Sequence, residues 1–189
     1  MPAEVPTIRT PRLELVSMSI PFMRVLVDRD HAAAEREIGA KIPEDLPDQL
    51  ERFVRYRLGQ LDVDPTILRW LARAMILTDE SGARTVIGTI GFHGAPDEHG
   101  RLEVGYRIEP EYRRQGYATE AVRAIFDWAV AEQGVHRFIA SIRPANQASL
   151  GLVAQFGFVQ TGTQIDEVDG LELVLEGEWP RPNASRGIA

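Results

Sequence analysis

The sequence of 189 residues contains no cysteine. Disulfide bonds, thiolate metal ligands and a cysteine nucleophile are therefore excluded, because each needs the sulfur of a cysteine side chain. It also lacks an apolar run of the about 18 residues that a membrane-spanning helix requires. Its first residues, MPAEVPTIRT, lack the basic and then apolar pattern of a secretory signal. We therefore predict a cytoplasmic protein with no membrane partner.

An excess of positive charge is also missing. The formal net charge is −7 at pH 7, whereas domains that bind nucleic acids usually carry an excess of Lys and Arg. The sequence therefore predicts no nucleic-acid partner, and it is compatible with a cationic substrate. The histidines show no spacing typical of a metal site, so we expect no metal. One of them, His93, directly follows a predicted strand, from which it could reach a substrate.

Three common active-site motifs are absent. There is no G-x-x-x-x-G-K-[ST] segment, which argues against a Walker-type nucleotide site. There is no G-x-G-x-x-G segment, which argues against a dinucleotide-binding fold. A serine hydrolase is not supported either, because the nucleophile motif G-x-S-x-G is missing.

The residues that are present predict a mixed α/β fold. Alternating apolar residues predict a first strand at residues 12–16, and helical spacing follows from Ser19 to Asp64 with a break at residues 38–47. Later helices are expected from Tyr117 to Gln133 and at residues 146–155. Further strands are predicted at residues 70–77, 85–92, 101–108, 137–142 and 174–179. This order predicts a mixed sheet with helices on its faces.

The length of the chain fits one domain with a sizeable core. We expect this domain to cover residues 1–180. The last residues, PRPNASRGIA, are polar and rich in proline. We therefore expect a flexible tail at residues 181–189.

One predicted helix begins beside positive charge. In EYRRQGYATEAV (Glu111–Val122), the unpaired N–H groups and positive dipole end of the helix lie near Tyr117. Asp or Glu usually accompanies such an end, but here Arg113 and Arg114 precede it. Gly116 would let the backbone approach a ligand closely, so an anion such as a pyrophosphate would complete the arrangement. The alternative is that both arginines are solvated and that Gly116 only serves a turn.

At this motif the sequence resembles the GCN5-related N-acetyltransferase (GNAT) superfamily. The family signature, [RQ]-x-x-G-x-[GA], is matched by Arg113, Gly116 and Ala118. IRTPRLEL (Ile8–Leu15) resembles the first strand of the branch with the ribosomal-protein N-terminal acetyltransferases, and NQASLGLVAQFGF (Asn146–Phe158) resembles the second cofactor segment. The resemblance implies a bacterial-type acyltransferase whose mixed, mostly antiparallel sheet has about seven strands and helices on both faces.

The family's activity is what the resemblance implies for this chain. It implies an N-acetyltransferase that moves an acetyl group from acetyl-CoA to a primary amine by direct attack in a ternary complex. The acceptor could be a small molecule or a protein N-terminus. The alternative is a non-catalytic acyl-CoA sensor, or a partner-binding subunit, on the same fold. From the family's tendency and the apolar segment LELVLEGEW (Leu171–Trp179) we also expect a homodimer.

The resemblance also assigns cofactor residues by their position. Pantetheine would pair like an extra strand with the backbone of Tyr106, Arg107 and Ile108. The pyrophosphate would be held by the loop and helix start, that is by Arg113, Arg114, Gln115, Gly116, Tyr117, Ala118 and Thr119. Asn146 would contact the cofactor and Ser149 would lie near its sulfur. As an alternative or an added role, Asn146 could be a helix N-cap.

Two residues are candidates for catalysis. Attack on the thioester needs a neutral amine, yet an alkylamine is mostly protonated near pH 7, so a base must take the proton directly or through water. We predict Glu103 as this base, with Gly105 on the same strand face leaving room for the thioester; a merely solvent-facing glutamate is the alternative. The wider superfamily often has a tyrosine acid seven residues after Asn146, where this chain has Val153. Ser149 or a water molecule is therefore the candidate that helps the thiolate leave.

Overall fold

The structure is a computed structural model that describes residues 5–168 and 170–181. The chain divides into a first unit, Met1–Phe92 with Tyr106–Ala124, and a second unit, His93–Gly105 with Ile125–Ala189. One strand and one helix, β5 (Arg101–Ile108) and α4 (Tyr117–Gln133), pass from one unit into the other. The single domain over residues 1–180 stays a prediction. The expected tail lies, apart from Arg181, outside the described residues.

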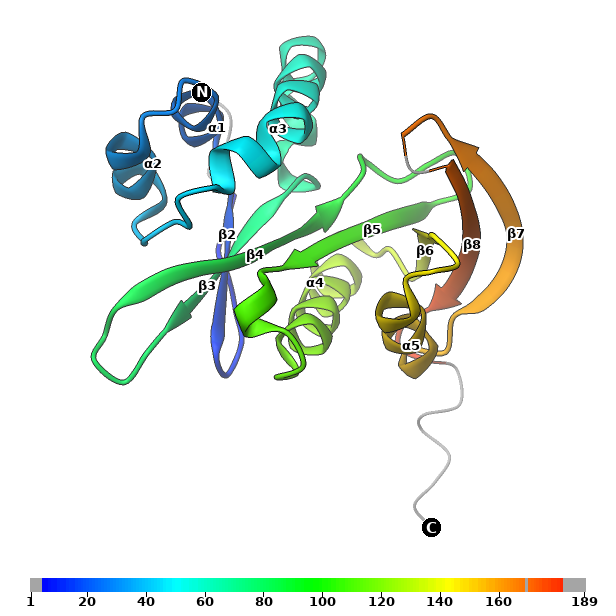
Figure 1. The fold of residues 1–189 in the computed structure, drawn as a ribbon. Coiled ribbons are helices and arrows are strands. Elements are labelled where there is room, and N and C mark those ends of the chain that lie inside the picture. The colour runs from blue at the N-terminus through cyan, green and yellow to red at the C-terminus, as the bar shows by residue number, and fades with distance from the viewer. Residues whose placement is uncertain (1–4, 169, 182–189) are drawn as a thin grey trace. The chain divides into compact units, whose positions relative to one another are not determined.

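The first unit combines an antiparallel group of strands with helices on both faces. The strands are β1 (Ile8–Arg9), β2 (Leu13–Ser17), β3 (Arg73–Thr78) and β4 (Arg84–Phe92). Three helices gather on one face, α1 (Ile20–Val27), α2 (His31–Ile38) and α3 (Leu46–Val63), and the first half of α4 lies on the other face (Figure 1). The core under the three helices includes the strand residues Ala74, Ile76 and Val86.

Local signals in the sequence explain where these helices begin and end. The Ser19 hydroxyl accepts a hydrogen bond from the backbone of α1, and the Asp30 carboxylate accepts one from the backbone of α2. Gly39, with a left-handed φ of 69°, ends α2. The predicted break between helices at residues 38–47 is therefore confirmed. The apolar stripe of α3 is also confirmed, because Leu50 and Val54 are buried in the core.

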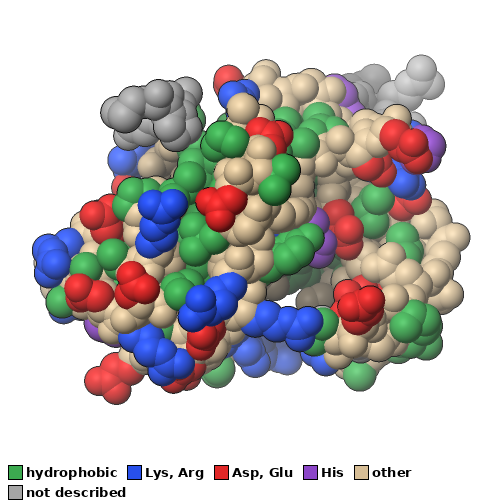
Figure 2. Space-filling view, turned by 90° about the horizontal axis from the view of Figure 1, so that it is seen from above, with side chains coloured by type: hydrophobic (Ala, Val, Ile, Leu, Met, Phe, Trp, Pro, Cys, Tyr) green, Lys and Arg blue, Asp and Glu red, His purple; other side chains and the backbone are tan. Residues whose placement is uncertain are grey.

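The exposed side of these helices carries charges of both signs (Figure 2). Arg29 pairs with Asp48 and Glu51, and Glu51 also pairs with Arg55. Exposed pairs of this kind contribute little to stability, because solvent screens the charges. We therefore read them as a solvated surface, without a functional assignment.

The strand β3 begins later than the sequence predicts. Residues 70–77 were expected to be extended, but a 3₁₀ helix, η1 (Pro65–Arg69), comes first and the N–H of Trp70 donates to its Ile67 carbonyl. The following hairpin is confirmed. The Asp79 carboxylate accepts hydrogen bonds from the backbone N–H of Ser81 and Ala83, as turn-forming aspartates commonly do.

The second unit holds the rest of the sheet around an aromatic cluster. Its strands besides β5 are β6 (Arg137–Ile142), β7 (Val159–Asp166) and β8 (Gly170–Glu178), and its helices are the second half of α4 and α5 (Gln147–Gln155). Phe126 of α4 stacks on Phe138 of β6 with ring centroids 4.0 Å apart. Phe126 also lies within 6.5 Å of the rings of Phe156, Phe158 and Trp179.

The strands follow the hydrogen-bonded order β1-β2-β3-β4-β5-β6-β8-β7. The ladders β6–β8 and β7–β8 are antiparallel, like those of the first unit, and β5–β6 is parallel. This confirms the predicted mixed, mostly antiparallel fold, with eight strands where about seven were expected. No helix among the described residues is long and apolar enough to cross a bilayer.

Candidate active site

The loop before α4 contains two residues with left-handed backbone conformation. A short 3₁₀ helix, η2 (Pro110–Tyr112), leads into this loop. Arg114 has a φ of 60° and Gly116 a φ of 83°. The Gly116 carbonyl accepts the first helical hydrogen bond, from the Glu120 N–H at 3.0 Å. The N–H groups of the next residues therefore have no place in the hydrogen-bond ladder of the helix, which is 17 residues long, and they lie at its N-terminus. The predicted helix start at Tyr117 is confirmed.

Arg12 reaches this loop from a position about a hundred residues earlier, and sequence reasoning missed it. Its Nη1 donates to the Gln115 carbonyl at 2.9 Å, and its guanidinium carbon lies 4.5 Å from the centre of the Tyr117 ring. A Cβ on Gly116 would lie 3.3 Å from its Nη2. A third arginine thus lies at the loop beside Arg113 and Arg114. Its only signal was its place in the segment that resembles the family's first strand.

Glu120 holds Arg12 in place. Its Oε2 accepts from Arg12 Nε at 2.7 Å, and its Oε1 accepts from the backbone N–H of Arg12 at 2.9 Å and from the Thr10 hydroxyl. Burial alone would raise the pKa of Glu120, but these hydrogen bonds and the charge of Arg12 outweigh it, and the net shift of the pKa is downward. The carboxylate therefore stays ionised and fixes the guanidinium beside the loop.

Two of the predicted pyrophosphate residues use their side chains to brace the loop. Arg113 Nε donates to the Ile108 carbonyl at 2.9 Å, which ties the loop to the end of β5. Gln115 Nε2 donates to the Glu111 carbonyl at 3.0 Å. Arg114 is exposed at the surface, as are Arg113 and Gln115. The first unit thus brings together all predicted residues from Tyr106 to Thr119.

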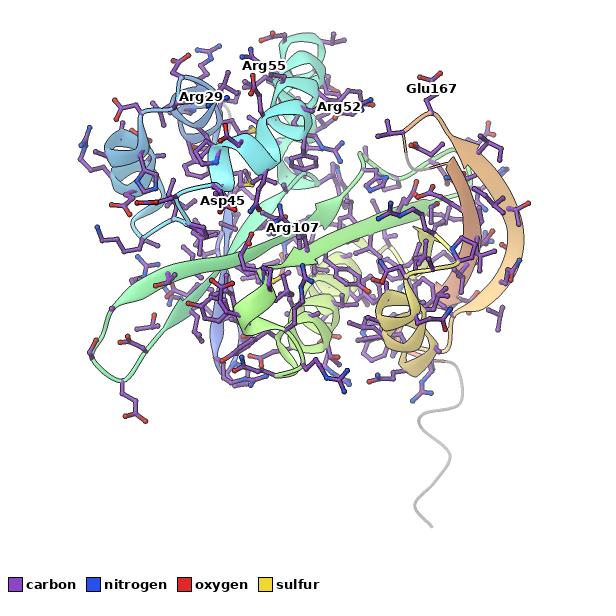
Figure 3. The ribbon with its side chains drawn as sticks, viewed as in Figure 1. Arg29, Asp45, Arg52, Arg55, Arg107 and Glu167 are labelled. Atoms are coloured by element: carbon purple, nitrogen blue, oxygen red, sulfur yellow. The ribbon has the colours of Figure 1, made fainter. Side chains whose placement is uncertain are left out.

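The end of β5 contacts the start of α3. Arg107 Nη2 pairs with the Gln49 side chain and lies 3.5 Å from Glu109 Oε1. Figure 3 shows Arg107 on the β5 ribbon below the first turn of α3, where Asp45 also lies. A Cβ on Gly88 of β4 would lie only 2.2 Å from the Arg107 carbonyl oxygen, so glycine is required for this close approach of two strands.

Glu109, the residue after β5, is a buried carboxyl group. It is 3% exposed, and its Oε1 has no hydrogen-bond partner. Burial raises the pKa of Glu109 and nearby Asp45 and Glu111 raise it further, while the charge of Arg107 partly opposes them. Sequence reasoning did not select this residue, because burial of a carboxyl group at a strand end leaves no pattern.

Replacing Glu109 with glutamine is expected to raise the melting temperature at pH 8 but not at pH 4. Because its pKa is raised by folding, the favourable contribution of the carboxyl is complete below its unfolded pKa and is lost as pH rises through the folded pKa. Glutamine cannot ionise and avoids this loss, and about 1 kcal/mol corresponds to about 2–4 °C in a chain of this size. Thermal scans of the variant and of the exposed control Glu80→Gln, in the β3–β4 hairpin, would measure it. If Glu109→Gln and the unmodified protein have equal melting temperatures at pH 4 and also at pH 8, Arg107 fully compensates the charge of Glu109.

In the second unit, Glu103 is paired with a histidine. It forms the last pair of the β5–β6 ladder, with Ile139, and its backbone carbonyl accepts from the His93 N–H at 2.9 Å. Its Oε2 lies 3.4 Å from His93 Nδ1, with side chains 28% and 52% exposed, respectively. Glu103 is therefore a half-buried member of a pair, and not a strand residue that only faces solvent.

The room predicted beside Glu103 is filled by the same histidine. A Cβ on Gly105 would lie 2.8 Å from His93 Nε2. Gly105 therefore makes space for the imidazole, whereas the sequence suggested space for the thioester. His93 directly follows the strand β4, and the strand pattern of residues 101–108 alone cannot show this contact. Space for the thioester at Gly105 stays a prediction.

Asn146 and Ser149 lie together at the start of α5. The Asn146 side chain accepts from the Ser149 N–H at 3.1 Å, so the alternative role of Asn146 as a helix N-cap is confirmed. The Ser149 side chain is half-buried in the first turn. Val153 is buried in the core, 1% exposed. Within residues 5–168 and 170–181, no group of three or more metal-binding side chains could hold a metal ion.

Comparison with known sequences gives a consistent assignment. The family described as "Acetyltransferase (GNAT) domain" matches residues 23–159, which include β5, the loop before α4, and α5. Over 154 residues the chain is 27% identical to the uncharacterized N-acetyltransferase YjdG of Bacillus subtilis (strain 168). That match covers 80% of this chain and 89% of the relative.

Solved structures share the fold. RimL, a ribosomal L7/L12 α-N-protein acetyltransferase in complex with coenzyme A, matches 92% of this chain and 98% of its own, with a TM-score of 0.62 and 15% identity. The ribosomal-protein-S5-alanine acetyltransferase of Vibrio fischeri matches 92% of this chain and 96% of its own chain, with a TM-score of 0.58 and 18% identity. At these identities the likeness shows the fold alone.

Proposed function

The chain belongs to the GNAT acetyltransferase family, and we propose that it moves an acetyl group from acetyl-CoA to a primary amine by direct attack in a ternary complex. The observation that carries this proposal is the loop before α4. It combines a helix N-terminus, the glycine at residue 116 and three arginines in one place. Such a loop suits the pyrophosphate of acetyl-CoA.

Backbone strain supports a role for Arg114. Its φ of 60° costs a residue with a side chain about 1–2 kcal/mol, and glycine is the usual residue at such a position. A charged side chain at a strained, exposed position favours function over stability. We propose that Arg114, Arg12 and the first N–H groups of α4 bind the pyrophosphate, while Arg113 and Gln115 keep the loop in shape.

For pantetheine we propose the backbone of Tyr106, Arg107 and Ile108. The β5–β6 ladder has its last pair at Glu103, so the later part of β5 lies beyond that pairing. The hydrogen bond from Arg113 to the Ile108 carbonyl fixes the end of this strand. An extended donor could add to such a strand by main-chain hydrogen bonds.

The catalytic roles are proposed residue by residue. We propose that the pair of Glu103 and His93 provides the base that removes the proton of the amine. Backbone N–H groups near Tyr106 would polarise the thioester carbonyl. We propose that Asn146 contacts the cofactor while capping α5, and that Ser149 helps the thiolate leave.

An assay of CoA release tests this function directly. Purified protein with acetyl-CoA would be offered peptides with a free N-terminus, one of them beginning with alanine, and also spermidine, a free amino acid and an aminoglycoside. The thiol released would be measured. The names of the two solved neighbours make the peptides the first choice. Amine-dependent release supports the proposal. Binding of acetyl-CoA without release for any amine would favour the non-catalytic acyl-CoA sensor.

We also propose a homodimer through the β7–β8 hairpin. β7 is the last strand of the order, and it and β8 expose apolar side chains, with Ile165 76% and Leu171 49% exposed. An exposed edge strand offers unpaired backbone groups with which another chain can pair. Light scattering at micromolar concentration should therefore give about twice the 21.1 kDa of one chain.

The variant Ile165→Glu should shift the mass to that of one chain, because it places a charge within the apolar patch. Val63→Glu is the matched control, since Val63 is 88% exposed at the end of α3 in the other unit. A mass near 21.1 kDa for the unmodified protein would contradict the dimer.

A further inference from the structure

The carboxylate of Glu103 faces a particular atom of His93. Its Oε2 lies 3.4 Å from Nδ1, and the backbone N–H of His93 donates to the carbonyl of Glu103. The two residues are thus held by both their main chains and their side chains. A carboxylate at Nδ1 favours the neutral tautomer with the proton on Nδ1. The lone pair then resides on Nε2, the nitrogen on the far side of the ring.

The position of Nε2 depends on Gly105. A Cβ on this residue would lie 2.8 Å from Nε2 and 3.4 Å from Cδ2, so any side chain there would displace the ring. Gly105 directly precedes Tyr106, the first of the residues proposed to pair with pantetheine. The missing side chain therefore lets Nε2 lie over β5, one residue before that segment.

Imidazole groups are, as a class, well suited to act as bases near neutral pH. An unperturbed histidine has a pKa of about 6.5 and an unperturbed glutamate about 4.3, and a general base works best when its pKa lies near the working pH. The His93 side chain is also the more exposed of the two, 52% against 28%. It is therefore more open to an incoming amine than the carboxylate is.

We propose that His93 Nε2 takes the proton of the acceptor amine and that Glu103 orients the imidazole and stabilises its charge. The inference rests on the proposed acetyl transfer. The amine nitrogen forms a bond to the thioester carbonyl carbon while its proton passes to Nε2. The C–S bond then breaks, and the imidazolium returns the proton to the CoA thiolate. Acetylated amine and CoA are the products, and His93 is neutral again. The arrangement follows the logic of a carboxylate–histidine pair in acyl transfer.

The tautomer can be measured without knowing the acceptor. Long-range ¹H–¹⁵N spectra of the protein with acetyl-CoA report which ring nitrogen of each histidine carries the proton, and His93→Asn identifies the His93 signals. We expect a proton on Nδ1 in the unmodified protein and a loss of this preference in Glu103→Gln. A proton on Nε2 in the unmodified protein would overturn the proposal.

The kinetics of variants distinguish a His93 that accepts the proton from a His93 that only positions Glu103. In His93→Asn the amide can still donate to Glu103 from near the place of Nδ1, but no group replaces Nε2. We expect kcat to fall by about 10²–10⁴, while KM for the amine and Kd for acetyl-CoA stay within about twofold. The double variant with Glu103→Gln should be little slower than either single variant, because the pair acts as a unit. If His93→Asn has the kcat of the unmodified protein, His93 only positions Glu103.

Gly105→Ala gives an independent check. If Gly105 serves to house the imidazole, the alanine lowers kcat in the unmodified protein and causes little further loss in a His93→Ala background. An equal loss in both backgrounds would instead mean that Gly105 makes room for the thioester. If the unmodified protein acetylates none of the amines, the proposed function fails, and the tautomer experiment still decides the state of His93.

Discussion

Replacing Gly116 with glutamate is expected to abolish the stabilisation of the protein by acetyl-CoA. A ligand that binds only the folded state at a hundred times its Kd adds about 2.7 kcal/mol to the free energy of unfolding. For a chain of this size that corresponds to a rise in melting temperature of about 5–10 °C. We expect this rise in the unmodified protein and none in Gly116→Glu, measured by thermal scans with and without millimolar acetyl-CoA.

The loss has two physical causes. The Cβ of the new residue would lie 3.3 Å from Arg12 Nη2, so its carboxylate would pair with the guanidinium and cancel the charge offered to the pyrophosphate. The side chain would also fill the space that the glycine leaves for the anion. The φ of 83° adds strain for any residue with a side chain, which lowers the stability of the unliganded protein as well.

Gly82→Glu is the control for that strain. Gly82 has a φ of 85°, its Cβ would meet no atom within 4 Å, and it lies in the β3–β4 hairpin. Without ligand, Gly82→Glu should lose about as much stability as Gly116→Glu. With acetyl-CoA, it should keep the full rise in melting temperature. If Gly116→Glu keeps the shift, the loop does not bind the pyrophosphate and the proposed cofactor site is wrong.

Most of the fold was predicted from local patterns of apolar residues and turn signals. The strands at residues 101–108 and 137–142 were predicted with their observed bounds, because their apolar residues alternate between clear turn signals. β7 was not singled out as a strand. Val159 and Ile165 are exposed and polar residues separate them, so no buried face shows in the sequence. Such an edge strand is fixed mainly by its ladder with β8, and this pairing is invisible along the chain.

The site was predictable where neighbouring residues define it and not where distant residues do. The loop around Gly116 combines its signals within a few positions, so the sequence predicts it as a candidate site. Arg12 reaches the same loop across about a hundred residues, and its partner Glu120 looks like an ordinary helix residue. The Glu103–His93 pair likewise joins two residues that lie ten positions apart in the sequence. Long-range contacts of single side chains leave no periodicity to read.

Replacing Glu103 with glutamine is expected to lower kcat by about 10²–10⁴, the range of a lost general base. Glutamine keeps the shape of the side chain but can neither accept a proton nor stabilise a charged His93. Binding of acetyl-CoA should barely change, because the carboxylate is assigned to the amine and not to the cofactor. The matched control is Glu178→Gln, an exposed glutamate at the end of β8, which should behave like the unmodified protein.

The pH dependence of the loss in Glu103→Gln distinguishes the roles that remain for the carboxylate. As pH rises, more of the amine is free without help from the enzyme, so the deficit of the variant should shrink if Glu103 serves proton removal. If Glu103 only attracts a cationic amine, the variant should show a raised KM with nearly unchanged kcat. Full turnover curves from pH 6 to pH 9 for both proteins would separate these cases. Equal kcat and KM at every pH would remove Glu103 from the mechanism, and the proton would then have to leave through water or the substrate itself.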